Sequence, residues 1–459
     1  MKKEFYEKLL KKSLDYGCEY AEIYIEDTEA KSFTLLNSKL DNMDFEKNHG
    51  TGIRISLNNQ VFYTAINSQD ENEIEKQFNN LLNNAGLTRT KDIEFTLEDN
   101  ETIQNDIKIE HDDYPINKKI DLLKKIDKRI RDYSDKISQV RVLLREFDKF
   151  FTIMNTDGKN KTAHDLVTRI TCIPIAEEND KKEDTVGNYG KGQGYEFLDD
   201  FNYEEFSDNV ADICVRKLSA KKFKGGKVPV VIGNGFGAVI FHEACGHALE
   251  ATAVSENLST FAGKLNQRIG TDKVTLIDDG TIPGEWGTTL IDSEGESTKK
   301  NILIEKGILK SYLVDKVNSK KMNHHVTGSG RRQDYRYAPT SRMNNTYLQK
   351  GTDKIEDMIK SIDYGVYCKS LRGGSVDTVT GDFNFSADEC YLIEKGKVTD
   401  MLTGITLIGK GQEVLKKVEM VSDDLKLATG YCGSVSGMIE VTIGQPTIKI
   451  SELLIGGQE

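Results

Sequence analysis

The sequence contains no apolar segment of the roughly 20 residues that a membrane-spanning helix needs. Its first residues, 1–7, carry several charges, and the apolar stretch of a secretory signal peptide does not follow them. We therefore expect a protein that is not exported and that has no membrane partner.

Paired cysteines are missing as well. The seven cysteines are odd in number, lie far apart, and include no Cys-x-x-Cys pair. In a chain of this length, that pattern is typical of reduced thiols, so we expect a cytoplasmic protein. Ser259, Thr260 and Ser297 have no Ser-His-Asp context, which disfavours a serine hydrolase.

The chain also lacks an excess of basic residues. Its formal net charge is -12 and its pI is about 5.3, whereas a nucleic-acid-binding surface needs clustered Lys and Arg. We therefore expect no nucleic-acid partner, while a peptide partner stays open.

The composition that is present, 37% hydrophobic and 30% charged, fits a globular protein. A chain of 459 residues is too long for one hydrophobic core. The Lys- and Gly-rich tract 221–227 marks a boundary. We predict an α+β region at 1–222, subdivided near 91–115, and a strand-rich domain at 223–459.

Periodic patterns predict the elements of the first region. Apolar residues recur at helical spacing in four segments, 3–15, 70–86, 117–133 and 204–219. Strands lie between them, including a hairpin that turns at Asn58-Asn59. The polar segment 91–115 is predicted to be a linker, and the charged, Gly-rich segment 177–195 a mobile loop.

The second region is predicted to be an antiparallel sheet or barrel. Three similar segments combine a β-branched run with a turn glycine, and they lie at 274–280, 301–307 and 389–396. An apolar run at 228–232 predicts a buried strand directly before a helix at about 235–251.

That helix carries the most informative motif of the chain, His242-Glu243-Ala244-Cys245-Gly246-His247. Two imidazoles beside a carboxylate are the parts of a zinc hydrolase: two metal ligands and Glu243 as a base for a zinc-activated water. The histidines stand at i and i+5, about 140° apart on an ideal helix. We therefore predict a π-helical turn or an unwound turn within 242–247, which Gly246 would ease.

A hydrolytic zinc site needs a third protein ligand. Cys432, close to Gly430 and Gly433 in a predicted turn, is our candidate. Cys245 is an alternative as a ligand or nucleophile, or else a small buried side chain. His324 and His325 are adjacent, so their side chains diverge and cannot easily share one metal. The remaining histidines lie in polar segments and are expected at the surface: His49, His111 and His164.

Four further segments resemble the TldD/PmbA family of metallopeptidases, specifically its metal-bearing TldD branch. They are Thr327-Gly-Ser-Gly-Arg-Arg332, Pro339-Thr-Ser-Arg-Met-Asn-Asn345, Gly444-Gln-Pro-Thr447 and the Gly456-Gly457 pair. With the histidine motif, the resemblance covers about residues 225–459. The chain departs from the family at Ser434, where a lysine is common, and at Glu256, where an aspartate is common.

The resemblance implies a metallopeptidase with one zinc per chain, bound by His242, His247 and Cys432. It also implies extended peptide substrates that pair with strands near the metal, and a dimer, either with a metal-free paralogue or with itself. Weaker candidates for substrate binding or for supporting the ligands complete the set: Glu250, Glu256, Arg331, Arg332 and Arg342. The alternative hypothesis is a non-catalytic, metal-containing subunit that binds or matures peptides.

Overall fold

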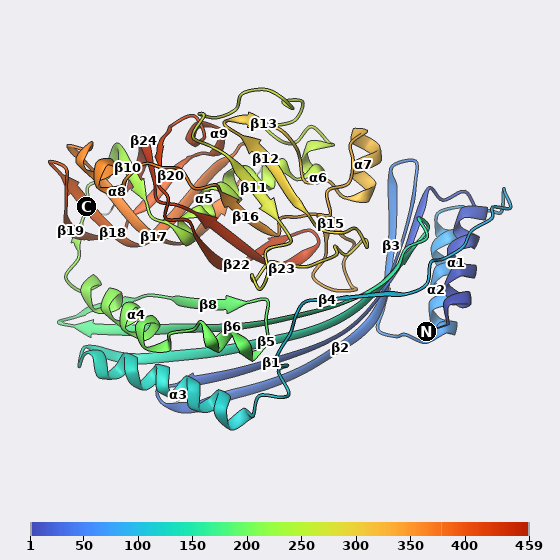
Figure 1. The fold of residues 1–459 in the computed structure, drawn as a ribbon, viewed down its shortest axis with the longest axis horizontal. Helices are drawn as coiled ribbons and strands as arrows, with labels where there is room; N and C mark the ends of the chain where they lie inside the picture. The colour runs from blue at the N-terminus through green and yellow to red at the C-terminus, as the bar shows by residue number, and fades with distance from the viewer. Residues whose placement is uncertain (1, 378, 458–459) are drawn as a thin grey trace.

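The computed structural model describes residues 2–377 and 379–457. The predicted regions 1–222 and 223–459 also include Met1, residue 378 and residues 458–459, which lie outside the described residues. The fold is α+β, as predicted. A long curved sheet in the N-terminal part lies beneath a strand-rich C-terminal part (Figure 1). No helix among the described residues combines the length and the apolar character needed to cross a bilayer.

The first sheet has the strand order β3-β2-β1-β5-β6-β4, and β7 and β8 also pair with β6. Its strands are β1 (Tyr20–Leu36), β2 (Lys39–Leu57), β3 (Gln60–Ile66), β4 (Glu101–Gln104), β5 (Ile137–Asn155), β6 (Asn160–Glu178), β7 (Lys181–Asp184) and β8 (Gly187–Lys191). The hairpin at Asn58-Asn59 is confirmed, since both residues adopt the left-handed conformation of a tight turn, with φ of 49° and 62°.

Alternation along β1 decides which face of this sheet meets which part of the molecule. Ile23 and Phe33 are buried against helices, whereas Tyr24, one residue from Ile23, faces the C-terminal part. The four predicted helices are confirmed, with α1 and α2 near one end of the sheet and α3 and α4 near the other (Figure 1). They are α1 (Lys3–Asp15), α2 (Glu71–Asn84), α3 (Ile116–Tyr133) and α4 (Tyr203–Lys217), with the 3-10 turn η1 (Tyr195–Asp199) before α4.

The predicted loop at 177–195 is wrong. Residues Asn179 and Asp180 form a tight turn, and β7 then folds back on β6. β8 pairs with β6 as well. The charges that suggested a loop lie at the end of β6, in the turn and along β7. The segment 91–115 is largely irregular, as predicted, and contributes only β4 to the sheet.

The C-terminal part is strand-rich and includes a barrel, as predicted, and its strands form two larger sheets. One has the order β17-β10-β24-β20-β18-β19-β9, with β21 paired to β24. β17 also pairs with β18, which closes β17, β10, β24, β20 and β18 into a five-stranded barrel. Its strands are β9 (Lys221–Lys222), β10 (Gly226–Ile232), β17 (Tyr364–Val376), β18 (Asp382–Glu394), β19 (Lys397–Thr403), β20 (Thr406–Lys410), β21 (Val418–Val421) and β24 (Ile448–Gly456).

The other sheet has the order β13-β12-β11-β16-β23-β22. The three similar segments are therefore split: the first two become β11 and β12, and the third belongs to β18 of the barrel. Pairing is mixed, since β10 and β17 run parallel, as do β16 and β23. The strands are β11 (Leu276–Asp279), β12 (Lys300–Glu305), β13 (Ile308–Leu309), β16 (Asn345–Leu348), β22 (Lys426–Ser434) and β23 (Gly437–Gln445).

The barrel and the six-stranded sheet share one apolar core. Strand β10 is followed by the segment 235–251, which carries the histidine motif, and Ile240, Phe241 and Ala244 of this segment are buried in this core. The remaining short elements lie around it: β14 (Gly330–Arg331), β15 (Thr340–Ser341), α7 (Lys316–Met322), α8 (Ile355–Lys360) and α9 (Gly411–Val414). The motif is thus fixed between the two sheets.

Candidate metal site

The predicted helix at 235–251 is a succession of short turns. They are η2 (Gly235–Ala238), α5 (Val239–Phe241), the π-helical η3 (His242–Gly246), the 3-10 turn η4 (His247–Leu249) and α6 (Ala251–Val254). The π-helical turn is confirmed: the N–H of His247 donates to the carbonyl of His242, an i to i+5 hydrogen bond. Widening by one residue brings side chains at i and i+5 onto one face.

Close packing against Met343 requires a glycine at position 246. Its backbone φ of -56° is ordinary helical conformation, so the glycine does not ease the distortion as we expected. A Cβ at this position would lie 2.1 Å from Sδ of Met343, which is fully buried. The Arg342-Met343 segment therefore packs directly on the π-helical turn, and a larger side chain at 246 would separate them.

His242, His247 and Cys432 converge. One potential ligand atom from each lies within 4.8 Å of the other two, and all three residues are buried. Nε2 of His247 and Sγ of Cys432 are 3.1 Å apart. Nδ1 of His242 is buried without a hydrogen-bond partner among the described residues. Two imidazoles, a thiol and an unpartnered buried nitrogen form a donor set that fits zinc.

Cys432 does not lie in a turn. It is the seventh residue of β22, opposite Ile439 of β23, and the hairpin turns only after Ser434. Gly430 and Gly433 favour a turn locally, but pairing with β23 extends the strand through both. The sulfur is carried to the motif by the six-stranded sheet, while the histidines come from the segment after β10.

The electrostatics of the cluster favour a thiolate. Burial would raise the pKa of Cys432, but His247 and His242 outweigh it and hold the pKa well below its usual value. Burial would lower the pKa of His247, but Glu250 and Cys432 raise it well above its usual value. A thiolate is the form of cysteine that binds a metal.

Two carboxylates of the motif region lie on opposite sides of the His247 ring. Oε1 of Glu250 is 3.1 Å from Nδ1, and Oε2 of Glu243 is 3.6 Å from Nε2. Glu250 is buried and thus orients the imidazole with Nε2 toward Cys432. The Glu243 side chain keeps 23% of its surface exposed and lines a cavity of about 450 Å³, together with Gly433 and Val435. A carboxylate placed there reaches both the cluster and whatever occupies the cavity.

Arg342 holds the cysteine strand in place. It is fully buried and donates to the carbonyl of Cys432, to Oγ of Ser436 at 2.9 Å and to the carbonyl of Gly437 at 3.0 Å. Its Nε lies 4.0 Å from Glu250. The sequence left this arginine open as a substrate contact or as a structural support, and its contacts in the structure are those of a support behind the ligands. In the sequence, only the position of Arg342 within the family-like segment 339–345 indicated a role near the site.

The other weak candidates lie apart from the cluster. Arg332 pairs with Glu22 of the first sheet, and Arg331 donates to the carbonyl of Met343 at 2.6 Å. The prediction that Glu256 supports a metal ligand is not matched by its contacts. Its side chain is exposed and pairs with Lys321 at 2.8 Å, and not with a histidine. An exposed ion pair with a neighbouring helix satisfies this carboxylate without the metal site.

The remaining thiol and imidazoles are not part of the cluster. Cys245 is buried in the apolar core, and burial raises its pKa, so it is the small packing residue among our alternatives. His324 and His325 do not diverge as expected, since their rings stack with centroids 4.3 Å apart, but neither belongs to the cluster. His49 is exposed, but the surface assignment is wrong for His111 and His164. His111 bonds Thr168 of β6 at 2.8 Å, and His164, itself a residue of β6, bonds Asp148 of the neighbouring strand β5 at 2.8 Å.

One residue that positions the motif had no signal in the sequence. Gly411, the first residue of α9, lies against the π-helical turn, and a Cβ there would be 2.1 Å from the carbonyl of Ala244. Its contact comes from a segment more than 150 positions away along the chain, and no local pattern reports it.

Comparison with known proteins agrees with this geometry. Profiles described as PmbA/TldA metallopeptidase domain 1, central domain and C-terminal domain match residues 21–85, 109–221 and 225–457. A Buchnera aphidicola protein named metalloprotease TldD homolog is 33% identical over 98% of this chain and 94% of its own length. A Haemophilus influenzae protein of the same name is 38% identical over 74% and 72%.

More distant proteins share the fold. A Saccharolobus solfataricus protein named zinc metalloprotease TldD homolog is 26% identical over 98% of this chain and 99% of its own. The crystal structure of TldE from Thermococcus kodakarensis superposes with a TM-score of 0.77 at 18% identity, covering 99% and 100% of the two chains. That of a candidate modulator of a DNA gyrase from Thermotoga maritima gives 0.79 at 20%, covering 99% of each. By its profiles and relatives, the chain belongs to the PmbA/TldD metallopeptidase family.

Proposed function

We propose that the protein is a zinc-dependent peptidase, with one zinc per chain, that hydrolyses peptides or unfolded protein segments. The observation that carries the proposal is the convergence of His242, His247 and Cys432 beside a cavity that Glu243 lines. When bound by these three residues, zinc supplies Lewis-acid activation of a water molecule.

Glu243 is the proposed general base. Its carboxylate lies on the cavity side of His247, where a water and a peptide carbonyl have access. There it accepts a proton from the attacking water and returns it to the leaving amine, a transfer that contributes roughly 10²–10⁴ in rate. Glu250 and Arg342 keep His247 and the Cys432 strand in register for this chemistry.

Strand β22 is the proposed docking strand for the substrate. It is the last strand of its sheet in the described part of the chain and pairs only with β23 there. Gly433 and Ser434, directly after the cysteine, line the cavity. An extended peptide that adds to this edge is held mainly through its backbone, which gives low sequence selectivity.

The rival hypothesis, a non-catalytic binding or maturation subunit, would be favoured by a closed site in which Cys245 or a carboxylate occupies the position of the water. The burial of Cys245 in the apolar core speaks against this cysteine as a fourth ligand. Three donors converge among the described residues, which leaves a position for water in a tetrahedral site. The open arrangement supports catalysis.

Assembly and location are part of the same proposal. We propose a cytoplasmic dimer, formed with itself or with a metal-free paralogue of the family. Purification from the native host followed by mass spectrometry and light scattering tests this. A second family chain, or twice the chain mass, is the expected result, and a monomer that hydrolyses peptides at full rate would contradict it.

Metal removal tests the activity itself. Hydrolysis of unfolded casein by the purified protein should cease with phenanthroline and return on addition of zinc. The non-chelating isomer of phenanthroline is the control and should leave the rate unchanged. Activity that persists after zinc has been removed, as verified by metal analysis, would contradict the proposal.

A further inference from the structure

We infer that a second cavity, on the far side of strand β22 from the metal cluster, binds short peptides through their free ammonium and carboxylate termini. This inference goes beyond the proposed function, because it concerns binding and holds whether or not the metal site hydrolyses peptides.

The cavity measures about 450 Å³ and lies between the first sheet and the C-terminal part. No residue that lines it also lines the cavity beside Glu243. The two are separated by the β22–β23 hairpin. Cys432 points to the metal cluster, while its neighbour Tyr431 lines the second cavity, as expected for adjacent residues of a strand.

Arg331 brings an unpaired cation to this cavity. It is only 9% exposed, and its hydrogen bond goes to the carbonyl of Met343. Within the described residues, no carboxylate lies at ion-pair distance from its guanidinium. Lys149, from the sheet side, is likewise bonded only to a carbonyl, that of Gln333 at 2.7 Å. Leaving a buried charge without a counter-charge costs several kcal/mol in typical proteins, and such groups mark ligand sites.

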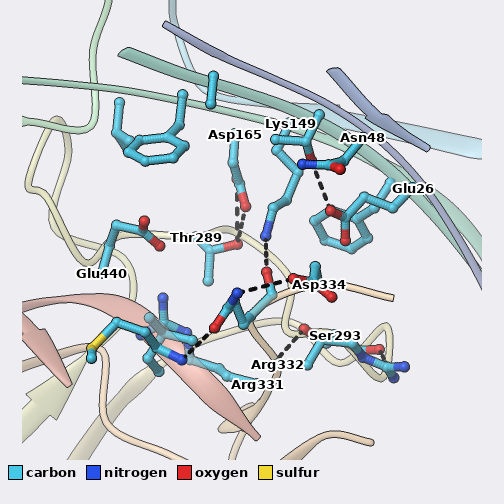
Figure 2. Close-up of a pocket in the computed structure, with 18 of the residues that line it drawn as sticks. Glu26, Asn48, Lys149, Asp165, Thr289, Ser293, Arg331, Arg332, Asp334 and Glu440 are labelled. Atoms are coloured by element: carbon cyan, nitrogen blue, oxygen red, sulfur yellow. Dashed lines mark hydrogen bonds between the residues drawn. The ribbon is translucent and has the colours of Figure 1, made fainter. Parts of the chain in front are cut away.

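Two carboxylates in the same cavity lack a cation. Asp165 accepts only from Oγ1 of Thr289, at 3.1 Å, and burial raises its pKa. The Glu440 side chain has neither an ion pair nor a hydrogen bond to any other described residue, and only its backbone is paired, with β22. Figure 2 shows Asp165 and Lys149 reaching in from the strands of the first sheet, with Arg331 on the opposite wall and Glu440 to one side.

The remaining walls suit an organic ligand. Five aromatic residues line the cavity: Tyr24, Phe147, Phe151, Trp286 and Tyr431. The cavity volume lies in the range of small-molecule sites, roughly 300–1,000 Å³. A simple anion would satisfy Arg331 and leave the acids uncompensated, and a simple cation would do the reverse. A ligand with both charges and an apolar side chain would pair with Arg331 and with the acids, and would also contact the aromatic residues. A short peptide with free termini has these features.

The test uses alanyl-phenylalanine as the probe and calorimetry on the full-length, zinc-loaded Glu243→Gln protein, so that the probe is not consumed. We expect saturable binding of one peptide per chain. The N-acetylated and the C-amidated forms should each bind roughly tenfold to hundredfold more weakly, as loss of a charge-assisted hydrogen bond implies. Equal binding of the blocked forms would overturn the inference, as would absence of binding.

Substitutions of the lining residues test whether the probe binds in the second cavity. Asp165→Asn and Glu440→Gln are near-isosteric and should weaken binding by a similar factor, and Arg331→Met should do so more strongly. Arg336→Met is the matched control: this arginine lines the same cavity but is already paired with Asp334, so affinity should stay within about twofold. Full affinity in Asp165→Asn and Glu440→Gln would overturn the inference.

The His242→Ala variant separates this site from the metal site. Binding of alanyl-phenylalanine should persist in it, because the second cavity contains no metal ligand. Loss of binding there would assign the probe to the metal centre and would overturn the second site while leaving the proposed peptidase intact.

Discussion

Cys432 and Cys245 are both buried thiols within reach of the motif, and they differ in what surrounds the sulfur. Sγ of Cys432 lies 3.1 Å from the Nε2 of His247, and the imidazoles lower its pKa. Cys245 is surrounded by apolar side chains, and burial raises its pKa. The first is therefore poised as a thiolate ligand and the second is an inert packing residue.

The two cysteines should respond differently to the same substitution. Cys432→Ser should weaken zinc binding by more than the roughly 10- to 100-fold that loss of an outer partner of a ligand costs, because a hydroxyl is a poor substitute for a thiolate. Cys245→Ser should leave zinc affinity nearly unchanged. Competition with a chromophoric chelator measures both, and the reverse order of effects would show that the ligand set is wrong.

At the scale of elements, the π-helical turn η3 works only with the segment that packs on it. Gly246 touches Met343, and Arg342 beside it bonds the carbonyl of Cys432. One short contact thus links the histidine-bearing turn to the cysteine-bearing strand.

Gly246→Ala should break this link. The added Cβ would lie 2.1 Å from Sδ of Met343, so zinc stoichiometry and stability should fall, with a cost of about 1–3 kcal/mol from overpacking. Adding Met343→Ala should restore part of the zinc, which metal analysis of the purified variants would show. Gly456→Ala, whose nearest contact would be 3.4 Å, is the control. Unchanged zinc in Gly246→Ala would contradict the packing argument.

The elements also show what the sequence could predict. The π-helical turn follows from the spacing of His242 and His247 alone, because helix geometry is local. The strand through Cys432 does not: Gly430 and Gly433 favour a turn, and only pairing with the distant β23 overrides them. The same holds for the 177–195 segment, whose charges suit a loop until β6 pairs with it.

Burial of isolated polar residues was equally unpredictable. His111 and His164 lie in polar sequence, yet β6 and its neighbours cover both. The second cavity is the extreme case, since its four charged residues without an ion pair (Lys149, Asp165, Arg331 and Glu440) come from β5, β6, β14 and β23. No spacing along the chain brings Asp165 near Arg331. Metal ligands carry a local motif, whereas a cavity between layers does not.

At the scale of the whole molecule, a buried charge network joins the first sheet to the C-terminal part. Nη2 of Arg54 lies 2.6 Å from Glu22 and 2.6 Å from Glu294, and Arg332 also pairs with Glu22. All four side chains are at most 1% exposed. Breaking such a network by removing one partner typically costs about 3–5 kcal/mol.

This network predicts a pH dependence of stability. Burial raises the pKa of Glu294 to about 8, although Arg54 opposes the shift, while an unfolded glutamate titrates near about 4.3. Between these values the folded state holds a proton that the unfolded state has released. The contribution of Glu294 to the free energy of unfolding should therefore be fully present below about pH 4.3 and be lost as the pH rises toward 8, by at most about 1.4 kcal/mol per pH unit.

Glu294→Gln should flatten that slope. Denaturant midpoints of the zinc-free protein between pH 5 and 8 measure it, and removal of zinc keeps metal binding from contributing to the pH dependence. An unchanged slope in Glu294→Gln would show that this carboxylate is ionised in the folded state and that Arg54 outweighs burial.

The central claim is that a three-ligand zinc site with Glu243 as base hydrolyses peptides. The most direct measurement is zinc content and casein-peptide turnover of Glu243→Gln beside wild type, prepared with the same partner chain. We predict about one zinc per chain in both proteins, unchanged folding, and turnover lower by roughly 10²–10⁴ in the variant. Undiminished turnover of Glu243→Gln with zinc fully bound would contradict the claim.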